Sequence, residues 1–288
     1  MSRGGALSAR ADLHTHTTAS DGLLSPAQLV GLARQRGLSA IAITDHDTVE
    51  GVAEVLTIPS SGLLVVAGVE LSCSLGCVDV HLLGYGLDIA VGGLRALLAE
   101  RADERRSRAE AIVERLGSLG AAVTMDRVMA LAGSGTIGRP HIARALVEAG
   151  HATGVGDAFE RYLGTGRPAY VERPVLLPDR AIREIHAAGG SAVLAHPLYS
   201  EGYGDFLPGL AESGLDGLEV VYPDHTADTR RSLSSLASRY DLIETGGTDF
   251  HGDFGRTGKG LGETTVSLAV VEQLAARASQ RRSIGRGA

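Results

Sequence analysis

Short apolar runs typical of buried strands alternate along this 288-residue chain with runs typical of helices. Residues 38–44 (LSAIAIT) form a near-continuous apolar segment, and similar strand signals occur at residues 191–195, 217–222 and 242–246. Helix signals lie between them, as at residues 226–240. Repetition of strand and helix in this order predicts an α/β protein with a parallel sheet or a barrel.

The alternation is interrupted from Gly92 to about Gly164, where helix signals dominate and no convincing strand appears. We therefore expect a barrel-like domain in two parts, residues 11–88 and 173–288, with a helical insertion at residues 89–172. Insertions in such barrels normally lie in the loops that follow strands and surround the active site. The charged run at residues 100–110 is expected to form a solvated helix face.

Charge and composition limit the partners that this chain can have. The net charge is −7 with histidine neutral, so a polyanionic substrate must be held by local cations. Cys73 and Cys77 are expected to be two small buried hydrophobes and not a disulfide. Residues 1–10 lack the apolar stretch of a signal peptide, and the longest apolar run, residues 63–69, is too short to span a membrane. We expect a cytoplasmic protein that binds neither membranes nor long duplex nucleic acid.

Histidines and acids end or directly follow successive apolar runs. They are His14, His16, Asp21, Asp45, His46, Glu70, His81, His196, Asp249 and His251. A single His-x-His or Asp-x-His pair says little, but packing gives no reason to collect so many ionisable groups, since burying unpaired polar groups is costly. Divalent metal ions do give a reason. Imidazole and carboxylate without thiolate suit manganese, iron or zinc.

The whole set of motifs resembles the polymerase and histidinol phosphatase (PHP) domain family. The motifs are His14-x-His16, Thr44-Asp45-His46, Glu70, His81, His196-Pro197 and Asp249-x-His251. The resemblance covers residues 12–87 and 173–263, and within the family it is greatest to small nucleotide phosphatases with a helical insertion. It implies a distorted (β/α)7 barrel with a trinuclear metal site.

The resemblance also implies how two or three divalent ions (manganese, iron or zinc) would be held. The expected ligands are His14, His16, Glu70 and Asp249 for the first ion, Glu70, His81 and His196 for the second, and Asp21, His46 and His251 for the third. Glu70 would bridge two ions, and Asp45, beside a ligand, would orient an imidazole. Some family members have histidine where this chain has Asp21. The nucleophile would be a hydroxide held between two ions, with no nucleophile from the protein.

Substrate-binding residues are expected mainly in the insertion. Arg139, His141 and Arg144 lie at the start of a helix, where basic side chains suit a phosphate group. His225 follows a strand end and is a further candidate. The expected substrate is a nucleotide phosphomonoester or terminal phosphodiester, most specifically a nucleoside 3′,5′-bisphosphate or the 5′ end of a short RNA. The alternatives are a histidinol-phosphate phosphatase and a non-catalytic PHP metal-binding module.

Overall fold

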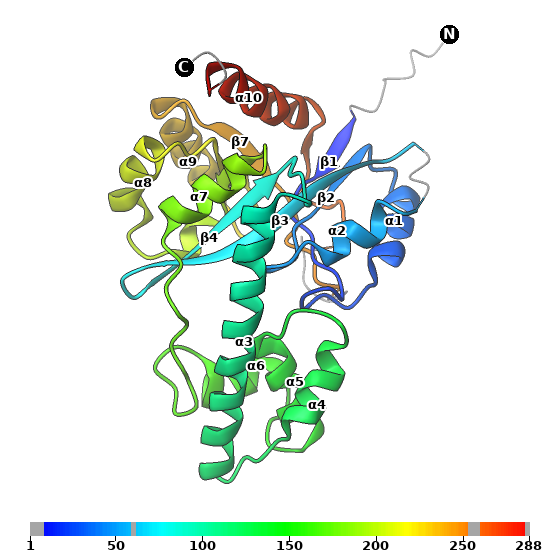
Figure 1. The fold of residues 1–288 in the computed structure, drawn as a ribbon, viewed down its shortest axis with the longest axis vertical. Coiled ribbons are helices and arrows are strands. Elements are labelled where there is room, and N and C mark those ends of the chain that lie inside the picture. Colours follow the sequence, from blue (N-terminus) through cyan, green and yellow to red (C-terminus); the bar gives the residue numbers. More distant parts are fainter. Residues whose placement is uncertain (1–8, 59–61, 253–259, 286–288) are drawn as a thin grey trace.

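The computed structural model describes residues 9–58, 62–252 and 260–285. Its eight strands form one sheet in the order β7-β6-β5-β4-β3-β2-β1-β8 (Figure 1). The strands are β1 (Arg10–Asp12), β2 (Ala40–Ile43), β3 (Leu64–Leu75), β4 (Val78–Tyr85), β5 (Ser191–Leu194), β6 (Gly217–Val221), β7 (Ile243–Gly246) and β8 (Val266–Ser267).

The sheet curls until its first and seventh strands meet. The Leu13 amide donates to the Gly246 carbonyl at 3.2 Å, and Thr15 forms a parallel bridge with Phe250. Glycine is required at 247 in this seam, because a Cβ there would lie 2.4 Å from the His14 nitrogen. The result is a nearly closed barrel, as expected. Its distortion comes from β4, which runs antiparallel to both β3 and β5.

Helices cover the outside of this barrel (Figure 1). They are α1 (Pro26–Gln35), α2 (Glu50–Val55), α7 (Pro178–Ala187), α8 (Tyr203–Glu212), α9 (Ala227–Arg239) and α10 (Ala269–Gly285), with a short 3-10 turn, η2 (Pro197–Tyr199). Helix α1 shows how local sequence sets a boundary. The Ser25 side chain accepts from the Gln28 amide and the Gln28 side chain accepts from the Ser25 amide, which satisfies two otherwise unpaired donors.

The insertion has its own apolar core. Helix α3 (Gly92–Ser118) starts in the barrel, where Leu94 and Leu97 pack in the main core, and ends in the insertion, where Ile112 and Leu116 pack in a separate one (Figure 1). The insertion continues with α4 (Met125–Ala132), α5 (Arg139–Glu148), α6 (Val155–Ala158) and a π-helical turn, η1 (Phe159–Leu163). Residues 92–164, all of them described, contain no strand.

Three details differ from the sequence-based expectations. The short strand β8, which pairs with β1, was not expected, because two residues carry no periodic pattern. Helix α10, which packs Leu274 into the barrel, was also not expected. Cys77 is exposed in the turn between β3 and β4, so only Cys73 is buried as expected. No helix in the described part of the chain is long and apolar enough to cross a membrane.

Candidate metal centre

The structure brings all nine predicted ligand residues together at one end of the barrel. Most follow a strand end or lie within a strand, and the Asp21 side chain comes from the loop before α1. His14 and His16 are fully buried. The side chains of His46, His81 and His251 are 17%, 22% and 27% exposed, respectively. The cluster is therefore open to solvent on the side of these three rings.

Glu70, on β3, is the centre of this cluster. Its Oε1 lies 2.8 Å from His81 Nδ1 and 3.0 Å from His196 Nε2. Its Oε2 lies 3.4, 3.2 and 3.0 Å from ring nitrogens of His14, His16 and His46. The two carboxylate oxygens thus face two different groups of imidazoles. A carboxylate that bridges two cations needs this arrangement.

Two aspartates complete the other side of the cluster. Asp249 Oδ1 lies 3.1 Å from His16 Nε2 and 3.4 Å from His14 Nε2. Asp21 Oδ1 lies 3.3 Å from His251 Nε2, and its Oδ2 lies 3.8 Å from His46 Nε2. The His251 Nδ1 is 2.9 Å from the Asp249 carbonyl, which accepts its proton and leaves Nε2 free to face Asp21.

The donor atoms of the cluster suit metal ions better than hydrogen bonds. Several are buried and lack any hydrogen-bond partner, namely His14 Nε2, His16 Nδ1 and Nε2, Asp21 Oδ1, His46 Nδ1, Glu70 Oε2 and His196 Nδ1. Unpaired buried polar atoms are costly, so their concentration here fits a place for cations. Three overlapping groups have the spacing of metal ligands: His16, Asp21, His46 and His251; His14, His16 and Glu70; and His46, Glu70 and His81.

The charge state of Glu70 also suits metal binding, because its carboxylate is ionised. Burial opposes its ionisation, but His46, His81 and His14 outweigh burial and hold the pKa of Glu70 well below its ordinary value. Burial lowers the pKa of His81 to about 4, so its imidazole is neutral near pH 7. Other rings keep their protons in the bare cluster: despite burial, Asp249 and Glu70 raise the pKa of His16 to about 10, so a divalent ion would displace that proton on binding.

Glu219, on β6, positions two of the predicted ligands and was not found from the sequence. Its Oε1 lies 3.0 Å from His14 Nδ1, and its Oε2 accepts from the His196 amide at 2.7 Å. The carboxylate is fully buried. By accepting the Nδ1 proton it leaves His14 Nε2 directed at Glu70. The available signal was an acid within an otherwise apolar strand, Gly217–Val221.

The backbone is strained at this end of the barrel. Three non-glycine residues, Asp47, His196 and Asp249, have positive φ values of 51°, 23° and 52°. Such conformations are uncommon for side chains with a Cβ and persist only where the surroundings impose them. Each residue follows the end of a strand. His196 and Asp249 present their side chains to the cluster there, whereas Asp47 directs its carboxylate to Arg105.

Asp45 has a different role from the one expected. We predicted that it orients an imidazole. Its carboxylate instead accepts from the Thr17 amide, the Thr17 hydroxyl and the Ser20 hydroxyl at 2.6 to 2.7 Å. Asp45 therefore fixes the loop that leads to Asp21.

Four arginines form a second charged group beside the metal centre. This basic cluster consists of Arg105 and Arg108 on α3, Arg139 on α5, and Arg173. Arg105 pairs with Asp47, and Arg173 pairs with Asp79. The prediction that residues 100–110 form a solvated helix face is therefore wrong in part. Arg105 and Arg108 turn toward the barrel and the insertion.

Arg108 and Arg139 form no ion pair with any carboxylate in the described residues. Arg139 donates to the Leu163 carbonyl at 3.2 Å and lies over the rings of Phe159 and Tyr170. Arg108 donates to the Val171 carbonyl and also lies over Tyr170. Burial, followed by repulsion from Arg139 and Arg173, lowers the pKa of Arg108 to about 10. An anion bound here would relieve that repulsion.

The other predicted substrate residues are divided between two places. His141 is buried and accepts from the Gly138 amide at 3.0 Å, and Arg144 is half-buried on the same helix. His225 is only 4% exposed, donates through Nδ1 to the Val220 carbonyl and packs against Tyr222. The Tyr222 hydroxyl in turn donates to Asp249 at 2.8 Å, so His225 lies behind the cluster rather than at its mouth.

Comparison with known proteins agrees with this geometry. The sequence profile of the PHP domain matches residues 12–118. The chain is 38% identical over 245 residues to a 5′-3′ exoribonuclease of Haemophilus influenzae, covering 83% of this chain and 89% of the relative. It is 34% identical over 262 residues to a 3′,5′-nucleoside bisphosphate phosphatase of Chromobacterium violaceum, covering 89% and 92%.

One solved structure resembles this fold along nearly the whole length of both chains. It is described as a metal-dependent phosphoesterase from Bifidobacterium adolescentis, with a TM-score of 0.84 and 35% identity over 93% of this chain and 96% of that chain. Identity at this level, over most of both chains, means that the two proteins share the barrel and the insertion. The chain therefore belongs to the PHP domain family.

Proposed function

We propose that this PHP-family phosphoesterase removes a terminal phosphate or nucleotide from a nucleoside 3′,5′-bisphosphate or the 5′ end of a short RNA. The observation that carries the proposal is the pairing of two sites. A cluster of unpaired imidazole and carboxylate atoms surrounds Glu70, and arginines without acidic partners lie beside it. The relatives named as an exoribonuclease and a bisphosphate phosphatase support the same class of substrate.

The first site would hold the reacting phosphate. Divalent ions, held as assigned from the sequence, would supply an activated water and positive charge for the phosphoryl oxygens. Glu70 would allow two ions to lie close together, because its negative charge offsets their repulsion. Glu219 would keep His14 in the tautomer that leaves Nε2 as a ligand. His46, His81 and His251 would line the open side, where the substrate enters.

The second site would hold the phosphate that does not react. The chain has a net charge of −7, so this phosphate needs its own cations. Arg108 and Arg139 supply them, and their aromatic and carbonyl contacts fix the guanidinium groups without neutralising them. A phosphate here would be held by charge-assisted hydrogen bonds. Binding energy from this remote group would position the scissile bond.

Phosphate and nucleotide release test the proposal directly. The purified protein would be treated with chelator, reloaded separately with manganese, iron or zinc, and analysed for metal content. It would then be assayed on a nucleoside 3′,5′-bisphosphate, a short 5′-phosphorylated RNA and histidinol phosphate. We expect activity to disappear on chelation, to return with metal, and to favour the two nucleotide substrates. Full activity in metal-free protein would exclude the mechanism, and preference for histidinol phosphate would favour the alternative substrate.

A further inference from the structure

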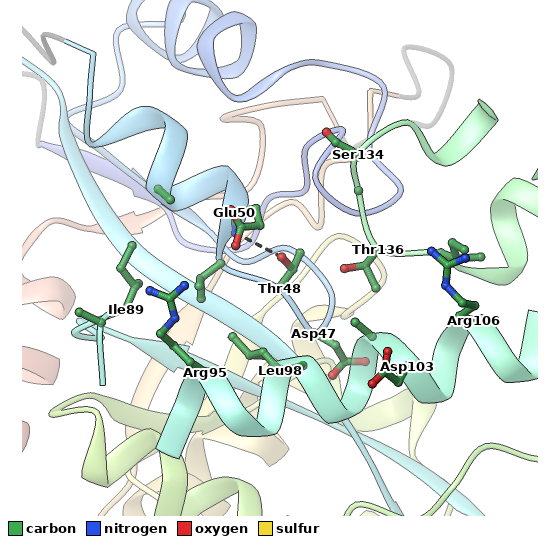
Figure 2. A pocket seen from close by; sticks show the side chains of 17 residues that line it. Asp47, Thr48, Glu50, Ile89, Arg95, Leu98, Asp103, Arg106, Ser134 and Thr136 are labelled. Atoms are coloured by element: carbon green, nitrogen blue, oxygen red, sulfur yellow. Dashed lines mark hydrogen bonds between the residues drawn. The ribbon is translucent and has the colours of Figure 1, made fainter. Parts of the chain in front are cut away.

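A groove with a volume of about 690 Å³ lies between the barrel and the insertion (Figure 2). We call it the seam groove. It is lined by residues 47–50 and Ala53 at the start of α2, by one face of α3 and by residues 134–137 of the insertion, with Ile89 and Ala90 at one end. Its volume lies within the range of small-molecule sites.

Two packed segments, residues 18–19 and residues 135–136, separate the seam groove from the metal centre. The Thr136 amide donates to the Ala19 carbonyl at 2.8 Å, and Gly135 packs so tightly on Thr18 that a Cβ would lie 2.4 Å from its carbonyl oxygen. Arg105 joins the barrel to the insertion on the same side by donating to Asp47 and to the Ile137 carbonyl, and none of the nine predicted ligands lines the groove. A molecule in the groove would therefore lie behind the active-site wall and not among the predicted metal ligands.

Each end of the groove offers a cation. Figure 2 shows Arg95 near Ile89 at one end, and Arg106 on the side of Thr136 at the other. Neither arginine forms an ion pair within the described part of the chain; Arg106 has only a long contact, 3.9 Å, to the sulfur of Met129. Both project from α3, where they are eleven residues apart, or about 16 Å along the helix axis.

The carboxylates of the groove decide which anion it can hold. Glu50 and Asp103 also line it and form no ion pair with described residues, while Asp47 is neutralised by Arg105. Two cations and two carboxylates leave no net charge, so the groove would not retain a polyanion such as RNA, whose binding depends on many neutralised phosphates. A ligand with one phosphate and several hydroxyl groups matches it better.

We propose that the seam groove binds a nucleoside monophosphate. The phosphate would lie on Arg106 and the Thr136 hydroxyl, and the ribose hydroxyls would donate to a carboxylate such as Glu50. The base would lie on the apolar wall that includes Leu98 and would stack on the Arg95 guanidinium. A nucleoside monophosphate is also a product of the proposed reaction, but the fit to the groove does not depend on that activity.

An NMR titration tests this site. Adenosine monophosphate would be added to the full-length, zinc-loaded protein labelled with nitrogen-15. We expect the amide signals of Gly135, Thr136 and Ala102 to shift. Arg106→Ala should weaken this binding about 10- to 100-fold, as expected for losing charge-assisted hydrogen bonds. Arg183→Ala, an exposed arginine on α7 outside the groove, is the matched control and should leave the affinity unchanged.

A second variant guards against indirect effects. Ala102→Trp would fill the groove from an exposed position on α3 and should abolish the shift at Gly135, with an unchanged circular dichroism spectrum. Arg139→Ala should leave the groove shifts intact, since Arg139 lies in the basic cluster. If the shifts map only to the metal centre and basic cluster, or if Arg106→Ala and Ala102→Trp leave them unchanged, the groove proposal is wrong. Groove binding by a protein that hydrolyses no nucleotide would instead contradict the proposed function alone.

Discussion

His14 Nδ1 lies 3.0 Å from one oxygen of Glu219, and the other oxygen of that carboxylate accepts from the His196 amide at 2.7 Å. One buried acid therefore fixes two predicted metal ligands that follow different strands, β1 and β5. It sets the tautomer of the first and the backbone position of the second. Metal ligands held in this way bind more tightly and in a defined orientation.

Glu219→Gln should lower both metal content and turnover. The amide keeps the shape of the side chain but removes the charge that favours a proton on His14 Nδ1. We expect a fall in kcat/KM of about 10- to 100-fold, together with weaker metal retention in elemental analysis. Glu244→Gln on the neighbouring strand β7 is the matched control, because Glu244 is exposed and bonds only to Ser234 among the contacts described. Wild-type metal content and kcat/KM in Glu219→Gln would remove its positioning role.

Glu70→Gln should have a larger effect. Glu70 faces five imidazoles, and a neutral amide cannot offset the repulsion between two ions. We expect the loss of at least one ion and a fall in kcat of about 10²-fold or more. Metal analysis and kinetics on the same preparation measure both effects. An active variant with its full metal content would show that Glu70 is not a bridge.

Arg139→Ala should discriminate between substrates. It should reduce kcat/KM on a nucleoside 3′,5′-bisphosphate about 10- to 150-fold, the range expected for a charged hydrogen bond of about 1.5–3 kcal/mol. An aryl phosphate has no second phosphate and should be affected much less. The ratio of the two values on one preparation cancels metal loading. Arg127→Ala, which breaks only an exposed pair with Glu148, is the control; equal losses on both substrates would exclude a phosphate role for Arg139.

Asp249→Ala and His196→Ala should lose activity but keep the fold. The apolar residues of the strands form the core, and neither side chain belongs to it. We expect far-ultraviolet circular dichroism spectra equal to that of the wild type and no measurable phosphate release. If both variants unfold in the presence of metal, these residues serve mainly stability.

Asp45→Ala should act on stability through one loop. The substitution leaves the Thr17 amide and two hydroxyl groups without their buried acceptor. We expect the free energy of unfolding to fall by at least about 2 kcal/mol, measured by chemical denaturation. Asp45→Asn keeps one acceptor oxygen and should lose less. Equal stability of the Asp45→Ala variant and the wild type would mean that the loop finds other partners.

The sequence was sufficient to predict those residues of the cluster that directly follow a strand. His14, His46 and Asp249 could be found because each follows an apolar run at the same end of the barrel. Glu219 lies inside a strand, so the sequence shows only an acid between apolar residues and not the imidazole it faces.

The predictions that were wrong mainly concern the direction in which a side chain points. Asp45 and His46 are neighbours, but adjacent residues of an extended chain point to opposite sides, so one faces the loop and the other the cluster. Arg108 belongs to a charged run of α3, and its orientation depends on packing between barrel and insertion, which no local pattern encodes.

If Arg108 holds the second phosphate, as proposed above, helix α3 also sets the distance of that phosphate from the metal centre. It runs unbroken from the barrel core to the insertion core, and Arg105 and Arg108 lie between the two. Adding one residue to the helix before them would shift these arginines by about 1.5 Å and rotate them by about 100°. The separation between the two proposed phosphate sites would therefore change in steps of about one full turn. Homologues that accept longer or shorter substrates would then differ by whole helical turns in this segment.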